Sequence, residues 1–187
     1  MSEQQGAVPD VSDRSAKDLD YWSFVELAKE RLDHEFDDND ARATRVILTL
    51  NRAASLVTYD LESSIHRPRG GSWSAFRMMF VIWLAGPMEP NVVANLAGMS
   101  RAAVSNLAKT LVAKGLLRKD AAADDGRAVT LTLTAPGLAE IRDTFREQNR
   151  RESSWAAVLT DIEQDLLVML LEKLMSQREQ VGAKARN

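Results

Sequence analysis

Apolar residues recur at helical spacing along most of the chain. The period of three to four residues predicts one helix over residues 19–36 and a longer helix over residues 40–65. The longer helix is expected to end at the breaker sequence HRPRGG, residues 66–71. A third helix, over residues 73–85, is apolar on nearly every side, so we expect it in the core.

Two short helices joined by a tight turn come next. Pro90 suits the first position of one helix, and Gly98 is expected to supply the left-handed conformation that ends it. Ser100 is expected to cap the second helix, and Gly115 to close it. The spacing A-x-x-x-G-x-x-x-x-x-V-x-x-L, which starts at residue 94, is typical of a helix-turn-helix.

The period then changes from helical to alternating. The segments LLRKD, residues 116–120, and VTLTLT, residues 129–134, predict two strands, and Asp125-Gly126 between them predicts a hairpin turn. Two more helices are expected after the strands. One begins near Thr134, and the other has a capping box that begins at Thr160.

The last of these helices has no polar side for more than one turn. Its sequence LLVMLL, residues 166–171, places apolar groups all round, whereas a surface helix of a monomer keeps one face polar. We therefore expect it to be buried on two sides against a second copy of the chain. The alternative is that helices of its own N-terminal half enclose it.

Together these elements predict a mainly α protein with a small β-hairpin wing, in which a winged helix-turn-helix is joined to a helical dimerisation domain. The expected parts are a disordered tail over residues 1–18, N-terminal helices for dimerisation and a pocket over residues 19–66, the winged helix-turn-helix over residues 72–134 and C-terminal dimerisation helices over residues 135–182.

The uneven distribution of charge along the chain points to a function for the helix-turn-helix. The whole chain has 27 Asp and Glu against 24 Lys and Arg, yet residues 90–119 contain five cations and no carboxylate. The side of the second short helix that faces away from its apolar residues carries Arg101, Ala102, Ser105, Asn106 and Lys109. Such a face fits the major groove of double-stranded DNA, where Arg and Asn pair with base edges while Ser and Lys meet phosphates.

Further DNA contacts are expected around this helix. Ser100 lies at its start, and Arg118 and Lys119 on the first strand could reach the backbone. Arg127 follows the hairpin turn and is expected in the minor groove, where the potential is most negative. The neighbouring residues Asp124-Asp125 are interpreted as turn formers, one of which could orient an arginine through an ion pair.

The helix-turn-helix and the sequence KGLLRKDAAADDGRAVTLTLTAPG, residues 114–137, resemble the multiple antibiotic resistance regulator (MarR) family of bacterial transcription factors. Lys119 stands where the family has an arginine in the first strand, and the similarity covers about residues 40–180. The resemblance implies a homodimer that binds pseudo-palindromic DNA and responds to a small phenolic or aromatic effector. We expect a transcriptional regulator that acts as a repressor.

The resemblance also implies a ligand pocket between the dimer domain and the winged domain. Its candidate residues here are Trp22, His66, Trp73, Phe76 and Arg77. Arg77 is expected to hold a carboxylate, and the aromatic rings to stack on a ligand ring. The alternative for each aromatic residue is an ordinary place in the core.

Composition excludes several other functions. The chain has no cysteine, which excludes disulfides, cysteine-ligated zinc and thiol redox sensing and fits a cytoplasmic location. Its two histidines, His34 and His66, lack metal-binding spacing, and no nucleophile, nucleotide or cofactor motif is present, so neither a metal, a cofactor nor an enzyme is expected. No apolar run approaches the roughly 20 residues of a membrane span. The strongest alternative function is a winged-helix module that binds protein instead of DNA.

Overall fold

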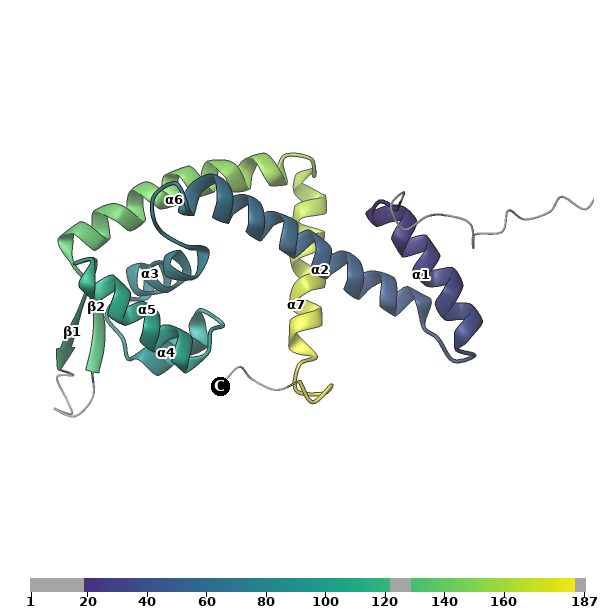
Figure 1. The fold of residues 1–187 in the computed structure, drawn as a ribbon, viewed down its shortest axis with the longest axis horizontal. Coiled ribbons are helices and arrows are strands. Elements are labelled where there is room, and N and C mark those ends of the chain that lie inside the picture. The colour runs from purple at the N-terminus through teal and green to yellow at the C-terminus, as the bar shows by residue number, and fades with distance from the viewer. Residues whose placement is uncertain (1–18, 122–128, 184–187) are drawn as a thin grey trace, which may run out of the picture. The chain divides into compact units, whose positions relative to one another are not determined.

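The computed structural model describes residues 19–121 and 129–183 (Figure 1). Within these residues it contains seven α-helices, one π-helical turn and a two-stranded antiparallel sheet, so the predicted fold class is confirmed. The chain divides into two compact units, residues 1–56 and residues 57–187.

The first unit contains α1 (Tyr21–Glu35) and the start of α2 (Ala41–Leu61). Asp20 caps α1, because its carboxylate accepts a hydrogen bond from the Ser23 backbone N–H at 2.8 Å. The Tyr21 hydroxyl reaches the Thr49 hydroxyl at 3.4 Å, and the Arg52 guanidinium lies 5.6 Å from the centre of the Tyr21 ring. These contacts hold α1 against α2, and the predicted helix over residues 19–36 is confirmed.

The second unit begins with the end of α2. The predicted helix over residues 40–65 is confirmed in extent, but its last turn is not α-helical. The last turn is the π-helical segment η3 (Glu62–His66), which widens the helix by one residue. The Glu62 carboxylate accepts hydrogen bonds from the Trp73 backbone N–H and from Arg67 Nε. The widened turn is therefore accompanied by hydrogen bonds from Glu62 to residues after the helix. Within the turn, Ile65 and His66 are buried.

The helices and strands of the winged body follow the predicted order. Serine or threonine caps and left-handed glycines mark their ends as expected: the Ser100 hydroxyl accepts from the Ala103 N–H, and Gly98 and Gly115 have φ of 61° and 70°. The elements are α3 (Trp73–Ala85), α4 (Pro90–Leu96), α5 (Arg101–Ala113), β1 (Leu117–Ala121), β2 (Val129–Leu133) and α6 (Ala135–Ala156).

Every element of the winged body contributes to one core. Fully buried side chains come from α3, α4, α5, β1, β2 and α6, namely Met78, Val93, Val104, Leu117, Leu131 and Ile141. A short bridge between Met88 and Leu131 joins the α3–α4 connection to β2. At the start of α6, a Cβ on Gly137 would lie 1.9 Å from the Leu116 carbonyl oxygen, so only glycine permits this close approach to the strand entry.

The final helix, α7 (Asp161–Ser176), begins with the predicted capping box between Thr160 and Glu163. It has no buried residue, although most of its side chains are apolar. Within the described part of the chain, no helix has the length and apolar character needed to cross a membrane.

Candidate nucleic-acid interface and adjoining cavity

α5 separates its apolar and polar residues onto opposite sides. Val104, Ala108 and Leu111 are buried in the core of the winged body. The recognition face, as we call the opposite side, is exposed to solvent and consists of Arg101, Ala102, Ser105, Asn106 and Lys109. The structure therefore brings these five predicted residues together on one surface. Ser100 precedes the helix as its N-cap, and its hydroxyl accepts a hydrogen bond from the Ala103 backbone N–H.

The wing carries an arginine that is held by a carboxylate. Arg118 Nε lies 3.0 and 2.9 Å from the two carboxylate oxygens of Asp120, and one of these oxygens also accepts the Thr132 hydroxyl at 2.7 Å. The Thr132 hydroxyl, and after it the Arg118 guanidinium, lower the pKa of Asp120. The sequence suggested that Asp124 or Asp125 in the turn could form an ion pair with an arginine. In the described residues the ion pair of Arg118 is formed by Asp120, which lies two positions after it on β1.

Of the other residues predicted to act in the wing, only Lys119 lies in the described part of the chain. Lys119 is exposed on β1, opposite Leu131 in the strand register. Arg127 and the pair Asp124-Asp125 lie outside the described residues.

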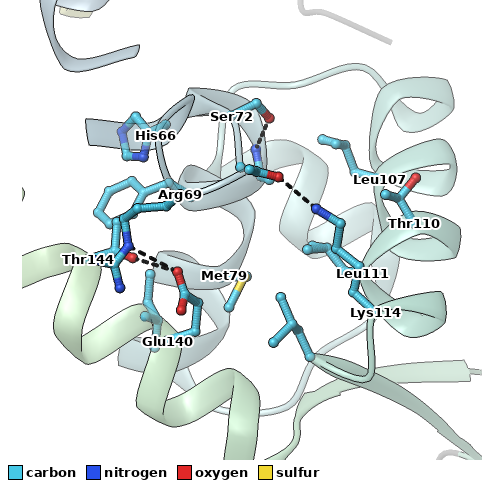
Figure 2. Close-up of a pocket in the computed structure, with 16 residues that line it drawn as sticks. His66, Arg69, Ser72, Met79, Leu107, Thr110, Leu111, Lys114, Glu140 and Thr144 are labelled. Atoms are coloured by element: carbon cyan, nitrogen blue, oxygen red, sulfur yellow. Dashed lines mark hydrogen bonds and ion pairs between the residues drawn. The ribbon is translucent and has the colours of Figure 1, made fainter. Parts of the chain in front are cut away.

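A cavity of about 500 Å³ lies beside α5 and is lined there by Leu107, Thr110, Leu111 and Lys114 (Figure 2), none of which belongs to the recognition face. Its walls come from η3, the residues that follow η3, and helices α3, α5 and α6. Most of the lining is apolar and includes Phe76, Met79, Leu107, Leu111 and Ile141. Its volume lies within the range of small-molecule sites.

Two cations line this cavity, and their surroundings differ. Arg69 forms ion pairs with Glu140 at 3.2 Å and with Glu147 at 2.9 Å. The hydrogen bond to Glu140 is the main cause that raises the pKa of Arg69. Lys114, at the end of α5, instead donates a hydrogen bond of 2.7 Å to the Gly70 carbonyl oxygen. Figure 2 shows Lys114 on the α5 side, Arg69 and Glu140 on the opposite side, and Met79 between them.

His66 is buried in the wall of the cavity. His66 is only 2% exposed, and this burial lowers its pKa and so favours the neutral imidazole. The ring lies 5.0 Å from the Phe76 ring and 5.7 Å from the Trp73 ring, centroid to centroid. Among the described residues, neither His66 Nε2 nor Gln148 Oε1 has a hydrogen-bond partner that meets normal geometry.

The five residues predicted to form a ligand pocket are therefore distributed unequally. His66 and Phe76 line the cavity, and Trp73 stacks on Phe76 without lining it. Arg77 lies beside the turn between α4 and α5. Its Nη2 atom is 3.1 Å from the position that a Cβ on Gly98 would occupy. Trp22 belongs to α1 in the first unit and is 64% exposed.

The sequence did not indicate the other polar residues that line the cavity, which are Arg69, Ser72, Thr110, Lys114, Glu140 and Thr144. Lys114 and Gly70 are 44 positions apart, and Arg69 and Glu140 are 71 apart, so no local spacing connects them. No cluster of metal-binding side chains occurs in residues 19–121 and 129–183.

Comparison with known proteins agrees with this geometry. A model of the MarR family matches residues 72–128, which contain the recognition face and the first strand of the wing. YwaE of Bacillus subtilis (strain 168), described as an uncharacterized HTH-type transcriptional regulator, is 31% identical over 132 residues, which are 71% of this chain and 77% of that protein. The chain belongs to the MarR family. It is thus a transcriptional regulator with a DNA-binding winged helix-turn-helix.

The solved structures that share the fold of this MarR-family chain include the following two. One is BpsR of Bordetella bronchiseptica, whose DNA binding is regulated by 6-hydroxynicotinic acid; it is 22% identical, with a TM-score of 0.64 over 70% of this chain and 98% of that chain. The other is NadR in complex with 4-hydroxyphenylacetate, also 22% identical, with a TM-score of 0.60 over 69% of this chain and 91% of that chain.

Proposed function

We propose that this MarR-family regulator is a cytoplasmic repressor that binds a pseudo-palindromic operator as a homodimer and releases it when a small aromatic effector binds. The recognition face supports this proposal most directly. It is exposed, it carries cations and hydrogen-bond donors, and it has no carboxylate. A helix surface of this kind suits the phosphate-lined major groove.

The residues of this face have distinct roles in the proposal. Arg101 and Asn106 pair with base edges, since Arg favours guanine and Asn favours adenine. Ser105 and Lys109 contact phosphates, and Ala102 is small enough to let the helix approach the groove. The remaining proposed contacts are made by Ser100, Arg118, Lys119 and Arg127.

Arg118 is well placed for a phosphate contact. Asp120 binds its Nε atom and so restricts the orientation of the guanidinium. The terminal nitrogens of an arginine held in this way can still donate to a phosphate oxygen.

The surface of α7 supports the homodimer. Its large apolar side chains are between 45% and 80% exposed in the single chain: Ile162, Leu166, Leu167, Val168, Met169, Leu170, Leu174 and Met175. A contiguous apolar surface of this kind marks a protein interface. A two-fold dimer built on it would present two recognition helices to half-sites about one DNA turn, roughly 34 Å, apart.

The cavity supports the effector. BpsR and NadR are associated with a heteroaromatic acid and an aromatic acid, respectively. In this chain, a mostly apolar cavity of about 500 Å³ is bounded in part by α5 itself. A ligand bound there would contact the helix that carries the recognition face, which gives a direct route from binding to DNA release.

Selection of bound duplexes from a random DNA pool, combined with sedimentation of the full chain, tests the proposal. We expect enriched sequences with two inverted half-sites about one helical turn apart, and a protein mass of two chains. A monomeric protein, or one that ignores duplex DNA even at very low ionic strength, would contradict the proposal and favour a winged-helix module that binds protein.

A further inference from the structure

The two cations of the cavity offer very different binding sites to an anion. Arg69 already contacts two carboxylates, those of Glu140 and Glu147. With two negative charges beside one positive charge, this wall of the cavity repels a further anion. The Glu140 carboxylate also accepts the Thr144 hydroxyl at 3.1 Å, which fixes it in place.

Lys114 presents the opposite case. Its ammonium donates to the Gly70 carbonyl, which is a neutral acceptor, and no carboxylate among the described residues lies within ion-pair distance of it. An ammonium has three donors, and this contact uses one of them. The Gly70 carbonyl thus positions the charge beside the cavity, while N–H groups remain for a ligand.

The space beside Lys114 suits a flat apolar group. Phe76 contributes an aromatic ring to the wall, and Met79 and Leu111 contribute flexible and branched side chains. An aromatic ring of a ligand can bury against such a surface. The polar groups then decide its orientation, because a carboxylate is attracted to the Lys114 side and repelled from the Glu140 side (Figure 2).

We infer that Lys114 binds the carboxylate of an aromatic acid in this cavity and determines its preference for acids over neutral analogues. The inference rests on the proposed function in that it takes the cavity to be the effector site. It assigns the role of anion anchor to a residue at the end of α5, in place of Arg77, which lies beside Gly98. Because α5 carries the recognition face, the ligand would act directly on the helix that contacts DNA.

Calorimetric titration of the full-length protein without DNA tests this assignment. The probes are benzoate, 4-hydroxybenzoate and 4-hydroxyphenylacetate, each compared with its neutral carboxamide at pH 7. We expect the wild-type protein to bind at least one acid about tenfold or more tightly than its amide, since hydrogen bonds between charged groups are roughly twice as strong as neutral ones. Lys114→Met should abolish this preference and leave amide binding unchanged.

Three further variants keep the test decisive. Lys114→Gln retains a donor for Gly70 without the charge and should also lose the preference, whereas Lys114→Arg should keep it. Arg142→Met removes a cation from the exposed surface of α6 outside the cavity and should change nothing. Retained preference in both uncharged variants, or failure of the wild-type protein to bind any of the acids, would overturn the inference.

The same proteins separate this inference from the proposed function. DNA binding is measured independently, on duplexes from the selection experiment and without any acid. A protein that binds the acids through Lys114 but does not bind DNA would overturn the proposed function alone. A protein that binds an operator but shows no role for Lys114 would overturn the inference alone.

Discussion

The helices α5 and α7 both expose a large surface, but the chemistry of the two surfaces is opposite. α5 buries three residues in the winged body and leaves a polar, cationic face in water. α7 buries none, and its exposed surface is largely apolar. α5 is therefore packed into the winged body through three residues, whereas α7 leaves most of its large apolar side chains exposed.

The difference shows that the kind of exposed surface, and not exposure itself, indicates the partner. A polar face costs little in water, so its meaning comes from the sign and arrangement of its charges. Exposed apolar area is unfavourable by about 25 cal/mol per Å², so it favours association with another apolar surface. Added salt should therefore weaken the contacts of α5 with DNA and leave an α7 interface nearly unchanged.

The largest effect is expected from charges placed on α7. The double variant Leu167→Asp/Leu170→Asp puts two carboxylates on one side of the helix, where burial of unpaired charge would cost several kcal/mol. We expect the protein to sediment as a monomer and to lose operator affinity by a factor of about 100 or more, because only one half-site remains bound.

Leu96→Asp is the matched control for this variant, since Leu96 on α4 is also an exposed leucine, at 57%. It should sediment like the wild-type protein. If the α7 double variant still has the mass of two chains, α7 does not form the interface. The exposed apolar surface of α7 would then not indicate a protein partner, in contrast to the argument above.

A single carboxylate on α5 should have the next largest effect. Ser105→Glu introduces a negative charge into the recognition face, where it would lie against phosphates. We expect at least a tenfold loss of operator affinity in fluorescence anisotropy, with an unchanged thermal midpoint. Ser105→Gln has similar size without the charge and should lose much less, so equal losses for Gln and Glu would exclude an electrostatic cause.

Much of the fold could be predicted because the signals that set it are local. The caps at Ser72, Ser100, Thr134 and Thr160 and the left-handed turn at Gly98 are each encoded within a few residues. The recognition face was predictable for the same reason, since helical periodicity alone determines which residues of α5 point outward.

The parts that sequence reasoning missed depend on distant contacts. The π-helical turn at Glu62 occurs together with a hydrogen bond to Trp73, 11 positions away. At the cavity, Lys114 contacts Gly70 and Arg69 contacts Glu140. The residues of each pair are far apart in the sequence, so no helical or strand periodicity predicts either contact. The Arg118–Asp120 pair is different, because alternate residues of a strand share a face and this spacing could have indicated it.

The salt dependence of DNA binding should then measure how much of the recognition face binds phosphate. The double variant Arg101→Ala/Lys109→Ala should reduce the slope of log affinity against log salt by about 0.9 for each phosphate that the protein no longer neutralises. If Arg101 reads a base, its single variant should also relax sequence preference. Arg142→Ala, on the exposed surface of α6, should change neither quantity. An unchanged slope in the double variant would mean that both cations lie outside the DNA interface.

The smallest effect is expected at a contact that touches neither surface. The Asp60 carboxylate, near the end of α2, binds Arg151 Nε and Trp155 Nε1 of α6, each at 2.7 Å. The Arg151 hydrogen bond is the main cause that holds the pKa of Asp60 far below its usual 3.8. A carboxyl group with a lowered pKa in the folded state stabilises the fold at neutral pH, and this contribution fades as the pH falls below the unfolded value.

Asp60→Asn should therefore lower the thermal midpoint at pH 7 by about 2–4 °C, the shift that a loss near 1 kcal/mol gives a chain of this size. The difference from wild type should shrink as the pH is lowered below about 4, because the wild-type carboxyl then begins to lose its charge advantage. Asp143→Asn, which breaks a more exposed ion pair with Arg146 on α6, should shift the midpoint by much less. Since Asp60 lies on neither exposed surface, the sedimenting mass and the salt slope should stay at their wild-type values. A change in either would show that the contact of Asp60 with α6 also affects the surfaces of α5 and α7.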